Sequence, residues 1–184
     1  NMSGTIKAET AAQDGGRIVL LGEGGKVNVS GTMNASGNRG GQIEVLGQDV
    51  TLASTANLNA NGTSGGGSIH VGGDYQGGGS TYRARNTTIE SGASLTTNAL
   101  TNGNGGEVVV WSDGNTSYAG NIEAKGGALS GSGGRMEVSG KGTLAFNGTA
   151  DASAANGVNG SLLLDPAFLD IGVSLASDIS TIST

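Results

Sequence analysis

Residues 40–62 read "GGQIEVLGQDVTLASTANLNANG", and the pattern in this stretch decides the fold. It holds three short segments, "QIEVLG", "QDVTLAS" and "ANLNANG", in which apolar residues fall at every second position. Such alternation is typical of β-strands, because successive side chains of a strand point to opposite faces. Turns rich in Gly, Asn, Ser and Asp separate the segments. The stretch therefore predicts three short strands and no helix.

The Gly-Gly cue that opens this stretch recurs along the chain. It stands at residues 15, 40, 66, 105 and 133, with a degenerate "NGSLLL" at 159. The first apolar positions after the cue are separated by 25, 26, 39, 28 and 26 residues. The longest step exceeds the common one by 13 residues, which indicates a 13-residue insertion at residues 74–86. A period of this length is the signature of a repeat protein.

A unit of three strands cannot bury its apolar side chains alone, but stacking units ~4.8 Å apart pairs their backbones and closes a core. The sequence predicts an all-β, right-handed parallel β-helix of about six coils with essentially no helix; the hand follows the general rule for parallel crossovers. The first strands are expected to send two columns inward: Ile18, Ile43, Ile69, Val108, Met136 and Leu162, and Leu20, Val45, Val71, Val110, Val138 and Leu164. The third strands are expected to add Ile6, Met33, Leu58, Leu95 and Ile122 beside Ala8, Ala35, Ala60, Thr97 and Ala124.

Composition narrows the function classes. Among 184 residues there are 37 Gly, one Pro and no Cys, and the net charge is −6. Nucleic-acid binding is not expected, because no basic face is present to release counterions. The lack of Cys removes disulfides and thiolate metal sites. No run approaches the ~18 apolar residues of a membrane span, so membrane insertion is not expected either.

Four longer stretches resemble a known family. They are "GGSIHVGGDYQGGG" from residue 66, "NGNGGEVVVWSDGNTSYAGNIEAKGG" from 102, "GSGGRMEVSGKGTLAFNG" from 131 and "GSLLLDP" from 160. In this order they resemble the exoproteins of two-partner secretion, the filamentous-haemagglutinin-like and high-molecular-weight adhesins of Gram-negative bacteria. The resemblance spans roughly residues 15 to 166 and implies an extracellular β-helical fibre at the bacterial cell surface, active in adhesion or biofilm aggregation. It also implies export by an outer-membrane transporter, engaged through a domain not in this chain.

One difference between this chain and the family indicates where in such a fibre the chain would lie. The amino-terminal secretion domain of the family carries Asn-Pro motifs, whereas the only proline here is Pro166. The chain is therefore expected to be a late part of the shaft. Residues 1–166 would form the shaft segment, and residues 167–184 the end of this solenoid section or the start of the next.

No catalytic, cofactor or metal site is expected. A phosphate loop needs a helix after the Gly-rich turn, and none is predicted. Glu107 is out of phase with Glu44 and Glu137, so the repeat does not stack paired carboxylates as a β-helical lyase or hydrolase would need. Turns that carry Asn, Ser and Gly argue against structural calcium. His70 lies between two inward positions and is expected to point to solvent.

The insertion is the most informative irregularity. It reads "DYQGGGSTYRARN" and places Tyr75, Tyr82, Arg83 and Arg85 in one loop. The next first strand, "EVVVW", sends Val109 and Trp111 outward, where polar residues are the rule. In one interpretation the tyrosines of the loop cover these two residues. In the other, the loop and Trp111 form a shallow site for an extracellular polysaccharide, a host receptor or another partner.

Three hypotheses for function remain open. The first is the shaft of a secreted adhesin, whose role is reach, rigidity and display. The second is a glycan-binding module that uses residues 74–86 and Trp111. The third is the stalk of a contact-dependent toxin.

Overall fold

The computed structural model describes residues 1–8 and 14–171 of the chain. In this range the regular structure consists of β-strands and one 3-10 turn, η1 (Tyr75–Gly77). The strands are β1 (Thr5–Lys7), β2 (Arg17–Val29), β3 (Thr32–Asn34), β4 (Gln42–Leu52), β5 (Asn57–Asn59), β6 (Ser68–Val71), β7 (Asn86–Ile89), β8 (Ser94–Thr96), β9 (Glu107–Val110), β10 (Asn115–Tyr118), β11 (Asn121–Glu123), β12 (Arg135–Phe146), β13 (Thr149–Asp151) and β14 (Ser161–Ile171).

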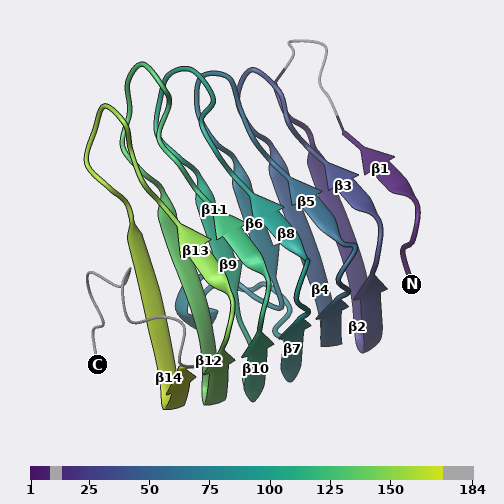
Figure 1. Ribbon diagram of the computed structural model, residues 1–184. Helices are drawn as coiled ribbons and strands as arrows, with labels where there is room; N and C mark the ends of the chain where they lie inside the picture. Colours follow the sequence, from purple (N-terminus) through teal and green to yellow (C-terminus); the bar gives the residue numbers. More distant parts are fainter. Residues whose placement is uncertain (9–13, 172–184) are drawn as a thin grey trace.

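The strands form two sheets that wrap around one core. A 6-stranded sheet runs β1-β3-β5-β8-β11-β13, and an 8-stranded sheet joins β2, β4, β6, β7, β9, β10, β12 and β14. Every strand pair is parallel, from β1 with β3 to β12 with β14. Figure 1 shows the coils stacked along one axis, with β1 and β14 at opposite ends of the stack. The predicted all-β parallel solenoid of about six turns, with essentially no helix, is confirmed; its handedness stays a prediction.

The predicted inward columns are confirmed by the strand register. Ile18 pairs with Ile43, Ile43 with Ile69, and Ile69 with Val108, and the column continues through Met136 to Leu162. Met33, Leu58, Leu95 and Ile122 line the opposite sheet and are fully buried. Ile6, on the terminal strand β1, is 38 % exposed because no described coil lies beyond it.

Two further columns of side chains fill the part of the core between the columns of the first strands and those of the third strands. Val29, Leu52, Ile89, Tyr118 and Phe146 stack in register in one of them. The rings of Tyr118 and Phe146 are stacked with centroids 4.8 Å apart. The buried hydroxyl of Thr87 donates to the carbonyl of Trp111 at 2.7 Å, so this polar group inside the core is satisfied.

The arrangement of strands within a coil differs from the prediction in one respect. The first and second segments of the repeat run on as one strand in β2, β4, β12 and β14, with register shifts at Gly22/Lys26 and Gly140/Thr143. They are separate strands only in the third and fourth coils, where the insertion and residues 111–114 interrupt them. Strand β14 also passes through Pro166 and stays paired to Ile171. The domain boundary near Pro166 stays a prediction, and residues 172–184 lie outside the described part of the chain.

The Gly-Gly pairs form a tight corner between the third strand of one coil and the first strand of the next. Gly106 donates its N–H to the carbonyl of Thr97 at 2.7 Å, and Gly67 donates to Ala60 at 2.8 Å. A Cβ atom on Gly106 would overlap the carbonyl oxygen of Gly67 in the preceding coil. Glycine is therefore required here for close backbone approach, which confirms that the recurring pair is a structural turn.

Candidate functional site

The insertion is a loop that closes on itself. It leaves β6 at Gly72, whose φ of +80° suits glycine, and returns to β7 at Asn86. At its base the N–H of Ala84 donates to the carbonyl of Gly72 at 2.6 Å. Near its start, the carboxylate of Asp74 accepts the N–H of Tyr75 at 2.8 Å and caps η1. The loop thus covers residues 72–85, slightly earlier than the predicted 74–86.

The loop lies over the outer side of the first strands. The register brings into one row the outward residues Glu44, His70, Val109 and Glu137. His70 is only 8 % exposed and Val109 is fully buried. The expectation that His70 points to solvent is therefore wrong. Its side chain does leave the core as the alternation predicts, but a distant part of the sequence covers the face onto which it emerges.

Trp111 lies directly beneath the loop and is 4 % exposed. A Cβ atom on Gly73 would lie 2.7 Å from Cδ1 of the indole, and one on Gly77 would overlap the ring. The loop backbone therefore packs flat against the aromatic surface. The covering interpretation is confirmed for Val109 and Trp111, but the residues on the indole are glycines and not the tyrosines that we expected.

The two tyrosines of the loop have other contacts. The ring of Tyr75 lies under the guanidinium of Arg135, with Cζ 4.1 Å from the ring centroid. The hydroxyl of Tyr82 accepts the N–H of Gly24 at 3.0 Å. Gly24 belongs to β2, so Tyr82 connects the later part of the loop to β2. Tyr75 connects the start of the loop to Arg135 of β12.

The two arginines of the loop differ in their surroundings. Arg83 donates from Nε to Asp113 at 3.0 Å, and Lys141 contacts the other oxygen of that carboxylate at 3.0 Å. Burial alone would raise the pKa of Asp113, but the hydrogen bonds from Lys141 and Arg83 outweigh it and hold the pKa below its usual value. The indole of Trp111 also points its N–H at this carboxylate, at 3.4 Å. Arg85 is exposed.

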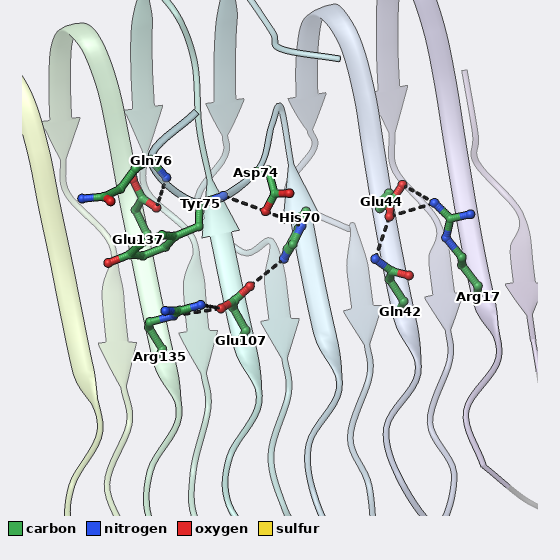
Figure 2. Close-up of polar contacts among 10 residues, drawn as sticks. All are labelled: Arg17, Gln42, Glu44, His70, Asp74, Tyr75, Gln76, Glu107, Arg135 and Glu137. Carbon is green, nitrogen blue, oxygen red and sulfur yellow. Dashed lines mark hydrogen bonds and ion pairs between the residues drawn. The ribbon is translucent and has the colours of Figure 1, made fainter. Parts of the chain in front are cut away.

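A polar cluster ties the start of the loop to the coils (Figure 2). The Nε2 atom of His70 lies 2.9 Å from Oε1 of Glu107, and its Nδ1 atom lies 3.4 Å from Oδ1 of Asp74. The other oxygen of Glu107 pairs with Arg135. The hydrogen bond with His70 is the largest cause that lowers the pKa of Glu107 to about 2; burial opposes it and Arg135 supports it.

This cluster was not foreseen from the sequence. Ligand-type atoms of His70, Asp74 and Glu107 all lie within 4.8 Å of one another. His70 and Asp74 are close in sequence, but Glu107 joins them only through the register of β6 with β9 across the insertion. The prediction that Glu107 is out of phase with Glu44 and Glu137 is confirmed, because those two residues lie in the row of His70 and Val109 and Glu107 does not.

Glu137 is the most deeply buried carboxylate under the loop. It is fully buried, and its Oε2 atom accepts the N–H of Gln76 from η1 at 2.8 Å. Within residues 1–8 and 14–171, its Oε1 atom and the hydroxyl of Ser139 have no hydrogen-bond partner. Burial raises the pKa of Glu137, and the Gln76 hydrogen bond only partly offsets this.

Glu137→Gln is expected to change how stability depends on pH. Because the pKa of Glu137 is raised on folding, its stabilising contribution is present at low pH and is lost as the pH rises through the folded value. The wild-type chain should therefore lose stability relative to Glu137→Gln as the pH rises from about 4 toward neutrality, with a slope of at most about 1.4 kcal/mol per pH unit. Urea denaturation at a series of pH values measures this difference.

Asp113→Asn is the matched control, because the pKa of Asp113 is lowered and its contribution is lost as the pH falls. Its pH slope relative to wild type should have the opposite sign. Identical pH profiles for wild type and Glu137→Gln would contradict the assignment of a raised pKa to Glu137.

Among solved structures, the chain is similar to the HMW1 secretion domain from Haemophilus influenzae. The two are 25 % identical, with a TM-score of 0.66, and the match covers 92 % of this chain. The resemblance to two-partner secretion exoproteins is confirmed. This chain spans 43 % of the length of that secretion domain, and its expected place late in a two-partner secretion shaft stays a prediction.

Other comparisons add little to this. Neither the protein-family models nor the curated proteins gave a match to the sequence. In the described part of the chain, no helix has the length and apolar character to span a bilayer.

Proposed function

We propose that this chain is a structural segment of a secreted, two-partner-type adhesin fibre, and that its role is to provide length and rigidity for display at the bacterial surface. The observation that carries this is the uninterrupted parallel stacking of both sheets over the described coils. Each coil is joined to the next by backbone ladders, which run along the long axis. The likeness to the HMW1 secretion domain supports secretion, and by extension export through an outer-membrane transporter.

The surface charges support a structural role over an enzymatic one. Glu44 is held by Arg17 at 2.9 Å, and Asp113 is held by Arg83 and Lys141. Carboxylates that are paired with fixed cations in this way hold coils and loop together. The pKa of Asp113 is held below its usual value, so this carboxylate is not poised for proton transfer, which requires a pKa near the working pH.

A glycan or partner site on the insertion is the second candidate, and the exposure of Arg85 favours it. In this alternative Arg85 and Arg83 would contact the ligand together with Tyr82 and Tyr75. Trp111 would act from below as the support of the loop, because its ring is covered. A host receptor or an extracellular polysaccharide is the kind of ligand proposed.

Deletion of residues 73–83 separates the two candidates. The deletion joins Gly72 to Ala84, whose backbones are already hydrogen-bonded at 2.6 Å. We expect the β-sheet circular dichroism to persist, and the fluorescence of the single Trp to shift to the red as Trp111 becomes exposed. Binding of bead-displayed chain to glycan arrays and host cells should be as low as for the intact chain.

Arg85→Ala serves as the matched variant that leaves the cover in place. If the intact chain bound a glycan and both Arg85→Ala and the deletion abolished that binding, the loop would be a recognition site and not a cover. The shaft proposal would then have to give way to the second candidate.

A further inference from the structure

The imidazole of His70 has a carboxylate at each of its ring nitrogens. Nε2 lies 2.9 Å from Glu107 and is within hydrogen-bond distance, whereas Nδ1 lies 3.4 Å from Asp74 (Figure 2). A neutral imidazole has one N–H donor and one lone pair. When the imidazole is neutral and donates from Nε2 over the shorter contact, the lone pair of Nδ1 faces the oxygen of Asp74. In that state two acceptor atoms face one another across 3.4 Å, and a cation between them would join them.

This spacing is that of two ligands of one metal ion. With metal–ligand distances of about 2.0 to 2.1 Å, neighbouring ligands of a tetrahedral zinc ion lie about 3.3 to 3.4 Å apart. The separation of Nδ1 and Oδ1 is 3.4 Å. On the other side of the ring, the hydrogen bond to Glu107 fixes the tautomer that frees Nδ1, as a carboxylate commonly does for a metal-bound histidine.

The charges around the cluster also favour a cation. Arg135 already neutralises Glu107. Among the described residues, His70 is the only ion-pair partner of Asp74, so no lysine or arginine pairs with this carboxylate there. The side chain of Asp74 is 36 % exposed and that of His70 is 11 % exposed, which gives an ion a path from solvent to a largely enclosed nitrogen.

We propose that His70 Nδ1 and Asp74 bind a divalent cation of the zinc class, with Glu107 holding the imidazole from behind. Water would complete the coordination. The imidazole ligand selects zinc-like ions over calcium and magnesium, which prefer oxygen ligands alone. The ion would join β6 to Asp74 near the start of the loop and so hold the cover over Val109 and Trp111. The proposal does not depend on the role of the chain as a shaft.

The chain has one histidine, so nitrogen NMR of the imidazole reports on this site alone. The probe is zinc chloride, added near neutral pH to the intact, ¹⁵N-labelled chain without an affinity tag. We expect the Nε2–H tautomer before addition and a large shift of the Nδ1 signal after it. One zinc ion per chain should bind by calorimetry, with a rise in melting temperature, and calcium chloride should have no effect.

Asp74→Asn is the decisive variant, because its amide oxygen can still accept the N–H of Tyr75 while the charged ligand is lost. Zinc binding should disappear although the fold persists by circular dichroism. Glu107→Gln should weaken zinc binding about 10- to 100-fold. Glu44→Gln is the control, because Glu44 lies in the same row as His70 but outside the cluster of His70, Asp74 and Glu107. This variant should bind zinc as wild type does.

Three results would overturn the proposal. The first is an imidazole signal that zinc does not move. The second is zinc binding that Asp74→Asn leaves unchanged. The third is a doubly protonated imidazole near neutral pH that takes up no zinc, because a proton would then occupy the place assigned to the metal.

Discussion

Replacing Ile69 by aspartate is expected to destabilise the solenoid by at least about 4 kcal/mol, enough to unfold its central coils. Ile69 is fully buried and lies in register between Ile43 and Val108. A carboxylate at this position would enter an apolar column with no cation or hydrogen-bond donor of its own. It would also break the stack from which both neighbouring coils take their contacts.

Thermal and urea denaturation followed by circular dichroism measure this loss. Ser117→Asp is the matched control, because Ser117 lies on the exposed side of β10. The control should change the free energy of unfolding by no more than about 0.5 kcal/mol. His70 is unsuitable as a control, because the insertion covers it. Equal losses for the two variants would contradict the inward assignment of Ile69.

Gly106→Ala is expected to be the second most damaging of the substitutions considered. At an unstrained position, replacing Gly by Ala stabilises a protein by about 0.4 to 1 kcal/mol, since alanine lowers the entropy of the unfolded chain. At Gly106 the added Cβ would overlap the carbonyl oxygen of Gly67, a backbone atom that cannot move without shifting the coil. We therefore expect the sign to reverse, with a loss of about 3 kcal/mol.

Gly25→Ala tests whether this effect is local. A Cβ atom on Gly25 would come no closer than 3.8 Å to its nearest neighbour, an ordinary van der Waals contact. This variant should be as stable as wild type or slightly more so. A Gly106→Ala chain that melts with the wild type would show that the coils can move apart at this corner without cost.

Much of the solenoid could be predicted because the patterns that determine it are local and repeated. The alternation around Ile69 and the Gly-Gly cue before it recur in each coil, so one unit predicts the register of the next. The continuity of the first two segments in β4 and β12 was missed, since Gly47 and Asp49 in β4, like Gly140 and Gly142 in β12, resemble a turn in sequence. In the structure they occupy only a bend of one long strand.

The candidate site could be predicted only in part, because it depends on contacts between distant residues. The covering of Trp111 by the loop was one of two interpretations of the sequence, but the contact of Gly73 and Gly77 with the indole was not expected. It gave no sign that Gln76 would reach Glu137, or that His70 would become buried. Outward residues obey the alternation, and their exposure depends on what packs over them.

The parallel stacking has a mechanical consequence for a protein that bears load along its axis. One coil stores about 26 residues in roughly 4.8 Å of fibre length. Pulled straight, the same residues span about 90 Å. A terminal coil that peels away under tension therefore lengthens the fibre nearly twentyfold over that coil, while the remaining coils keep their registry. In the proposed role as a shaft, the solenoid would carry a reserve of extensible chain that is released one coil at a time.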